Sequence, residues 1–181
     1  KNRLAVVNNM TNRKKNNVMI AGIGGASLGS ELQKCISACK KNVVFGCDIS
    51  PEAYGHFLNG FEKTYVVDKS QYVENVIEVC LETNTTFLIP GGEEPMFLLG
   101  EAIKTLASNG ITLLGNSRKI ISLFSNKCDT FNTLASLGLV IPKTQVVNSK
   151  KNIEYVGIPC IIKPSTDSGG STNVFFATSV D

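Results

Sequence analysis

Short β-rich runs alternate with helical patterns from Val18 to Leu114, and this alternation limits the fold more than any other feature of the chain. Parallel strands need a crossover between them, usually a helix, so such a pattern predicts a parallel sheet. Strands are predicted at 18–21, 43–47, 64–67, 87–89 and 111–114. We therefore expect an α/β fold, a Rossmann-like parallel sheet with helices on both faces.

The pattern changes after Gly115. Two successive helical segments are predicted at 117–124 and 125–137, and strand-like runs follow at 144–147, 159–163 and 174–177, with no helix expected between them. Residues 18–115 are thus expected to form one domain. Residues 116–181 would begin a second, α+β lobe, and residues 1–17 a flexible leader.

Composition excludes some classes of function. No apolar run approaches the roughly 20 residues that span a bilayer, so no membrane segment is expected. The leader is basic but lacks the aromatic residues of a single-strand nucleic-acid binder, so no nucleic-acid partner is expected. The six cysteines form no CxxC pair, and we expect buried reduced thiols in a cytoplasmic protein.

A glycine-rich turn, residues 22–29, lies between the first strand and the first helix, where Gly24 and Gly25 let the backbone approach a ligand. Three interpretations remain open: a structural turn, a site for a nucleotide or small substrate, and a dinucleotide site in which Asp48 binds the ribose. A second turn, Gly91-Gly92-Glu93, follows strand four. Glu93 either caps the next helix or faces the crevice at the carboxyl edge of the sheet.

The segment from Gly157 to Val174 carries the strongest chemical pattern. A predicted strand ends at Lys163, and a loop containing Ser168, Gly169, Gly170 and Ser171 leads to the next strand. Backbone N–H groups of such a loop can point at phosphates, and the lysine adds a positive charge. A flexible hairpin connection is the alternative for the loop by itself.

These features, in this order, resemble the ATP-grasp superfamily, in particular its carbamoyl-phosphate-synthase-like and carboxylate-amine ligase branches. The resemblance extends from Val18 to Asp181. It rests on the two glycine turns, Asp48-Ile49-Ser50-Pro51, Asn126-Lys127 at a helix start, the segment 138–144, and the Lys163 strand with its loop. The family places a Rossmann-like pre-ATP-grasp domain before the ATP-grasp lobe.

The resemblance implies that Lys127 and Lys163 contact ATP phosphates, and that Ser168, Gly169, Gly170 and Ser171 cover them. Gly24, Gly25 and Glu93 are candidates for substrate binding, and no catalytic residue is identified. ATP and Mg²⁺ are the expected cofactors, with the metal ligands downstream of Asp181 and none within this chain. Small-molecule carboxylate and amine substrates are the expected partners, and homodimerisation is open.

The expected activity is that of an ATP-dependent ligase that converts a carboxylate to an acyl-phosphate for attack by an amine. Two alternatives are an NAD-dependent dehydrogenase or epimerase, and a nucleotide-binding module without catalysis. Because the chain stops soon after the glycine loop, we expect it to be a portion of a longer polypeptide and inactive by itself.

Overall fold

A computed structural model describes residues 15–25, 28–166 and 173–179 of the chain. It forms two compact units, Lys1–Arg118 and Lys119–Asp181. The division at Arg118 lies near residue 115, where the sequence pattern changes. Each unit is described by itself below.

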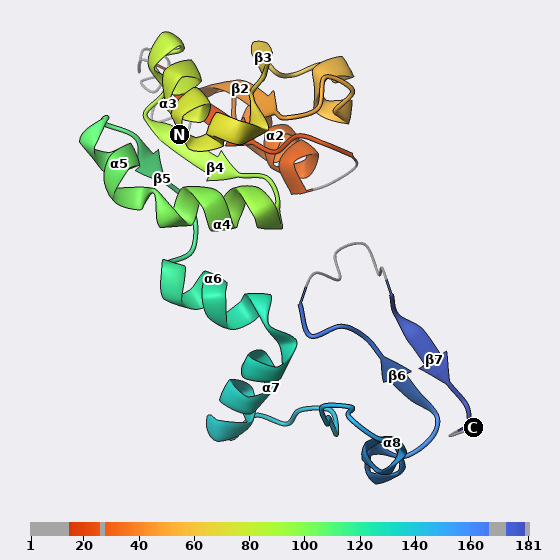
Figure 1. The fold of residues 1–181 in the computed structure, drawn as a ribbon. Helices are drawn as coiled ribbons and strands as arrows, with labels where there is room; N and C mark the ends of the chain where they lie inside the picture. Colours follow the sequence, from red (N-terminus) through yellow and green to blue (C-terminus); the bar gives the residue numbers. More distant parts are fainter. Residues whose placement is uncertain (1–14, 26–27, 167–172, 180–181) are drawn as a thin grey trace, which may run out of the picture. The chain divides into compact units, whose positions relative to one another are not determined.

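The first unit is built on a parallel sheet of five strands in the order β3-β2-β1-β4-β5 (Figure 1). The strands are β1 (Asn16–Ala21), β2 (Asn42–Asp48), β3 (Lys63–Val66), β4 (Phe87–Pro90) and β5 (Thr112–Leu113). Every pairing is parallel, with Val18 opposite both Val44 and Phe87. The chain adds β2 and β3 on one side of β1 and then crosses to the other side to add β4 and β5. The order in which strands are added therefore reverses between β1 and β4.

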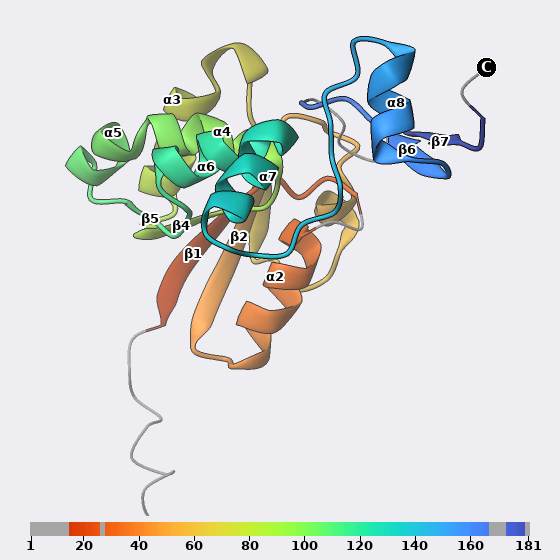
Figure 2. The ribbon, with the colours of Figure 1, turned by 90° about the horizontal axis from the view of Figure 1, so that it is seen from below.

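Helices cover both faces of this sheet (Figure 2). They are α2 (Leu28–Ala38), α3 (Tyr72–Glu82), α4 (Glu93–Glu101) and α5 (Ile103–Ser108), with short 3-10 helices η1 (Tyr54–Phe57) and η2 (Lys69–Gln71). Along β1 the side chains alternate: Met19 packs with α3, α4 and α5, while Ile20 packs with α2. The expected doubly covered parallel sheet is confirmed.

Helix α2 buries only part of its apolar stripe, since Leu32 and Ile36 pack against the core. The apolar positions Leu28 and Cys35 are exposed, whereas Gly29, Ser30 and Gln33 are buried. The helix starts directly after the glycine turn, and a Cβ at Gly29 would collide with the carbonyl oxygen of Gly22. Close contact with the turn therefore fixes the rotation of the helix, and the apolar positions follow from it.

The cysteines fall into three groups by exposure, and two of them, Cys128 and Cys160, are half-buried. Cys47 and Cys80 are fully buried, as expected, and burial raises the pKa of both thiols, to about 12 for Cys80. Cys35 and Cys39 are exposed, so the expectation of buried thiols is wrong for them. All six are free.

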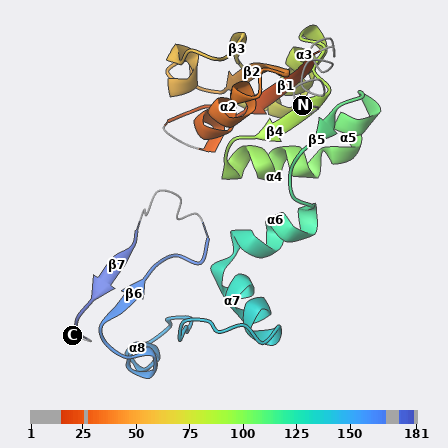
Figure 3. The same cartoon turned by 180° about the vertical axis from the view of Figure 1, so that it is seen from behind.

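The second unit contains helices, a long irregular connection and an antiparallel pair of strands (Figure 3). Its elements are α6 (Arg118–Ser125), α7 (Lys127–Ser136), α8 (Lys150–Val156), β6 (Cys160–Ile162) and β7 (Phe175–Ala177). Ile161 lies opposite Phe176 in the antiparallel pair. Gly138, with φ of 77°, ends the second of the two predicted helices.

Two expectations for this unit are wrong. Residues 144–147 form no strand, and the Thr144 hydroxyl instead donates a local hydrogen bond to the Pro142 carbonyl. Helix α8 was not expected either. It starts after Ser149, where the Asn152 side-chain oxygen accepts hydrogen bonds from the Ser149 N–H at 2.9 Å and from its hydroxyl at 3.0 Å.

No helix in the described part of the chain is both long and apolar enough to span a bilayer.

Candidate functional site

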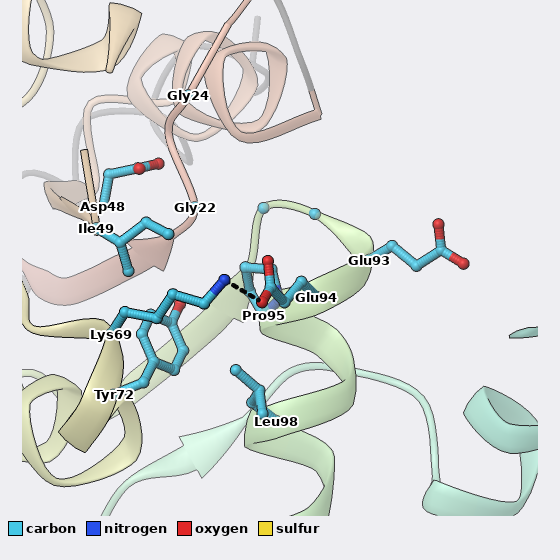
Figure 4. Close-up of a pocket in the computed structure, with 12 residues that line it drawn as sticks. Gly22, Gly24, Asp48, Ile49, Lys69, Tyr72, Glu93, Glu94, Pro95 and Leu98 are labelled. Carbon is cyan, nitrogen blue, oxygen red and sulfur yellow. Dashed lines mark ion pairs between the residues drawn. The ribbon is translucent and has the colours of Figure 1, made fainter. Parts of the chain in front are cut away.

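A cavity of about 280 Å³ opens at the carboxyl edge of the parallel sheet in the first unit (Figure 4). It lies where the loops that follow β1 and β4 diverge, at the point where the strand order reverses. Open α/β sheets bind ligands at this type of position. The cavity is lined by Gly22, Gly24, Asp48, Ile49, Lys69, Tyr72, Gly91, Gly92, Glu93, Glu94, Pro95 and Leu98.

Glycines set the shape of the cavity floor. The Gly91 N–H donates to the Ala21 carbonyl at 2.6 Å, which ties the second glycine turn to the end of β1. A Cβ at Gly91 would collide with the Gly22 carbonyl oxygen, as would one at Gly29. The two turns and the start of α2 therefore approach one another at a distance that leaves no room for side chains.

The Asp48 carboxylate holds the first glycine turn in place. One oxygen accepts a hydrogen bond from the Ile23 N–H at 2.7 Å, and the other accepts from the Ser50 N–H at 3.0 Å. Asp48 is buried, and a Cβ at Gly24 would lie 3.3 Å from its carboxylate. Both oxygens thus accept hydrogen bonds from the backbone. Asp48, which the sequence offered as a ribose ligand, therefore has a structural role here.

Helix α4 begins at the cavity. Its N-cap residue, Gly92, has an extended backbone and no side chain. The first N–H groups of the helix therefore receive no side-chain cap. A Cβ added at Gly22 would lie 2.8 Å from the Pro95 ring, so this ring leaves no room for a side chain there. Glu94 forms an exposed ion pair with Lys69 at 3.2 Å, and the Glu93 side chain points away from the cavity (Figure 4).

Tyr72 forms part of the cavity wall and has an unusual hydroxyl. The residue is 7% exposed, and its hydroxyl oxygen is buried without a hydrogen-bond partner among the described residues. Burial raises the pKa of the phenol well above its ordinary value, and the nearby Cys47, Asp48 and Glu94 raise it further. The group is therefore a neutral hydrogen-bond donor at physiological pH.

Sequence reasoning located part of this cavity. Gly24 and Glu93 line it, whereas Gly25 lies in the same turn outside the lining, with φ of 71°. It missed Lys69 and Tyr72 as lining residues. Tyr72 is a buried position of α3, and its place in the first turn of a helix that follows a strand was the available signal.

The second unit brings together the segments that carry Lys127 and Lys163. Lys127 is the first residue of α7, and its N–H donates to the Ser165 carbonyl at 2.9 Å. The Lys163 ammonium lies 5.8 Å from the centre of the Phe131 ring, one turn further along α7. Asn126 caps the helix by accepting hydrogen bonds from the N–H groups of Cys128 and Asp129. The segment after β6 therefore runs against the start of α7.

The predicted phosphate loop, Ser168, Gly169, Gly170 and Ser171, lies outside the described residues. No cluster of three or more His, Cys, Asp or Glu side chains suited to a metal occurs in residues 15–25, 28–166 and 173–179.

Comparisons with known proteins give the context of this fold. No family model matches the chain. An uncharacterized protein of Methanocaldococcus jannaschii is 24% identical over 127 residues, which are 68% of this chain and 30% of that protein.

Solved structures match over nearly the whole chain. The biotin carboxylase domain of 2-oxoglutarate carboxylase from Hydrogenobacter thermophilus, in complex with MgADP, ADP and bicarbonate, has a TM-score of 0.64 at 17% identity; the match covers 93% of this chain and 39% of that one. N5-carboxyaminoimidazole ribonucleotide synthetase from Thermotoga maritima gives 0.60 at 15%, covering 91% and 41%. L-amino acid ligase from Bacillus licheniformis gives 0.61 at 16%, covering 93% and 40%.

These three proteins are ATP-grasp enzymes, and the chain has the fold of their N-terminal portion. It spans about two fifths of their length. The parallel five-stranded sheet with its helices, together with the small antiparallel pair, thus matches the N-terminal region of these enzymes.

Proposed function

We propose that this chain is the nucleotide-handling N-terminal part of an ATP-dependent ligase, which activates a carboxylate as an acyl-phosphate for attack by an amine. The observation that carries the proposal is the contact between the start of α7 and the segment after β6, which gathers the Lys127 and Lys163 backbones in one place. It occurs within a fold shared over about nine tenths of the chain with enzymes of this type.

Two lysines on neighbouring segments suit the polyphosphate of ATP. Each ammonium offers three N–H donors and a positive charge, and charge-assisted hydrogen bonds to phosphate oxygens are about twice as strong as neutral ones. In the reaction, a carboxylate oxygen bonds to the γ-phosphorus as the bond to ADP breaks. The amine then bonds to the acyl carbon, inorganic phosphate leaves, and the amine gives up a proton. Lys127 and Lys163 offset the charge of the phosphates during the first step.

Mg²⁺, which accompanies ATP in such reactions, is not assigned to this chain. The donor set here consists of ammonium groups and backbone N–H groups, which bind anions, and Mg²⁺ requires oxygen ligands. We therefore assign the phosphates, and not the metal, to these lysines.

A dehydrogenase is the less favoured function because of Asp48. A ribose-binding acid needs its carboxylate oxygens available to the two ribose hydroxyl groups. Here both oxygens accept hydrogen bonds from the backbone N–H groups of Ile23 and Ser50, so Asp48 supports the turn itself.

Nucleotide binding to the full-length protein tests the proposal. Lys163→Ala is expected to weaken Mg-ATP binding by about 1–3 kcal/mol in calorimetry, because a charge-assisted phosphate contact is lost. Lys151→Ala, an exposed lysine in α8 of the same unit, is the matched control and should leave the affinity unchanged. Equal affinities for wild type and Lys163→Ala, or binding of NADH in place of Mg-ATP, would show that the proposal is wrong.

A further inference from the structure

Two exposed cysteines lie one helical turn apart at the end of α2. Cys35 belongs to the helix, and Cys39 directly follows its last residue. The turn continues through Cys39, because the Lys40 N–H donates to the Ser37 carbonyl at 3.1 Å. Residues four apart on a helix share one face, with about 5–6 Å between their Cβ atoms. The two thiols therefore form a pair on the surface of the first unit.

The Cys39 sulfur lies against the turn that carries Cys35. Its thiol donates to the Ile36 carbonyl at 3.1 Å, in the preceding turn of the helix. The Asn42 side-chain N–H donates to the same sulfur at 3.2 Å. A hydrogen bond donated to sulfur favours its negatively charged form, which is the form that binds metals. These two contacts hold the thiol on the side of its neighbour.

The spacing of the pair suits an ion between the sulfurs better than a disulfide. A disulfide requires Cβ atoms about 3.5–4.5 Å apart, which is less than the separation that one helical turn provides. A bridging metal ion replaces one S–S bond of about 2.05 Å with two metal–sulfur bonds of about 2.3 Å each. Such a bridge spans the larger distance without unwinding the helix.

We propose that Cys35 and Cys39 bind a soft monovalent metal ion, Cu(I), between their two sulfurs. Thiolate sulfur selects soft ions of this kind, whereas Mg²⁺ and Ca²⁺ require oxygen ligands. A structural Zn²⁺ site needs four ligands, and no cluster of three or more suitable side chains occurs in the described part of the chain. Both thiols release a proton as the two Cu–S bonds form, so the charge of the site changes from zero to −1.

Lysines next to the pair offset this negative charge. Lys40 and Lys41 follow Cys39 directly, and neither forms an ion pair with another described residue. Cations stabilise a nearby thiolate, and here they oppose the effect of the carbonyl groups at the helix end, which disfavour negative charge. Glu31, one turn before Cys35, is itself paired with Lys34 at 2.7 Å. The surroundings thus suit a metal complex with one negative charge.

Competition for Cu(I) tests this site. The reduced protein is titrated with Cu(I) in the presence of bathocuproine disulfonate, a chelator whose colour reports the copper that the protein does not hold. Size-exclusion chromatography then gives the number of chains for each bound ion. Cys35→Ser and Cys39→Ser each remove one proposed ligand. Cys128→Ser, at a half-buried thiol in α7 of the second unit, is the matched control.

We expect the wild type to hold one Cu(I) in each monomeric chain. Either Cys35→Ser or Cys39→Ser should weaken binding by about 100-fold or more, because residues that merely support a metal ligand already contribute about 10–100-fold. Cys128→Ser should bind as the wild type does. The proposal would be overturned by equal binding in wild type and either variant, by one ion shared between two chains, or by loss of all copper to the chelator.

Stability gives a second measurement on the same variants. Without copper, the two serine variants should unfold in urea as the wild type does, because both thiols are exposed. Added Cu(I) should raise the Tm of the wild type and of Cys128→Ser, but not that of Cys35→Ser or Cys39→Ser. A rise of equal size in all four proteins would contradict the site. Copper binding does not depend on the proposed ligase activity, so the Lys163 experiment can fail without affecting it.

Discussion

The two units of the chain differ in how their elements are held. In the first unit, strands, helices and turns share a buried core, and even polar residues such as Ser30, Gln33 and Asp48 are buried and bonded. In the second unit, none of the described residues is buried. Its hydrogen bonds are largely local, as at the start of α7 and α8.

The two units therefore hold their residues in place by different means. The first unit positions its cavity by close backbone contacts and buried hydrogen bonds, which tolerate little change. The second unit leaves large apolar side chains exposed, among them Ile161, Phe175 and Phe176 of the antiparallel pair. Substitutions should therefore have large effects at the cavity floor and modest ones in the second unit, and three experiments test this order.

The largest effect is expected at the contact between the glycine turns. Gly91→Ala would place a methyl group against the Gly22 carbonyl oxygen, so we expect a loss of about 3 kcal/mol in the free energy of unfolding, measured with urea. Gly92→Ala is the control one residue away, because its added carbon would lie 3.6 Å from Pro95, an ordinary contact. Equal stability of the two variants would show that the turns are less tightly packed than described.

A smaller loss is expected at Asp48. Asp48→Asn replaces one of two accepting oxygens with an NH₂ group, which then faces a backbone N–H, so we expect a loss of about 2 kcal/mol by the same measurement. Asp68→Asn, at an exposed carboxylate that accepts from Ser70, should cost much less. If Asp48→Asn is as mild as Asp68→Asn, the carboxylate does not hold the turn.

The smallest effect is expected at the α7 cap in the second unit. Asn126→Ala removes the oxygen that accepts from the Cys128 and Asp129 N–H groups, at a cost of about 1 kcal/mol. Amide hydrogen exchange in the first turn of α7 should accelerate by about fivefold. Asn132→Ala, at an exposed position within the same helix, is the control and should leave this exchange unchanged or slower. A loss as large as that at Gly91 would break the contrast between the units.

Much of the first unit could be predicted from sequence because its signals are local. Strand positions follow from runs such as 18–21, and the start of α4 follows from the Gly92-Glu93 turn, where acidic residues favour a helix N-terminus. The strand order could not be read from the sequence, since it depends on pairing between distant segments. The rotation of α2 could not be predicted either, because it depends on close contact with Gly22 and not on the spacing of apolar residues along the helix.

Two residues that line the cavity could be selected from the sequence, and their role in substrate binding stays a prediction. Gly24 and Glu93 were identified because turns after strands lie at the carboxyl edge of a parallel sheet. Tyr72 was not, because an aromatic residue on a helical stripe gives no sign of which way its hydroxyl points. Lys127 and Lys163 remain predictions as phosphate ligands, and the loop of Ser168 to Ser171 lies outside the described residues.

The strand order has a consequence for how the chain behaves among other chains. It leaves β3 and β5 as the outer strands of the sheet, and exposed outer strands can pair with strands of other molecules. β5 has only two residues, and β3 has four, with Lys63 paired to Glu82 across its face. Both outer strands are short and one of them carries a charge, and these features oppose the addition of a strand from another molecule.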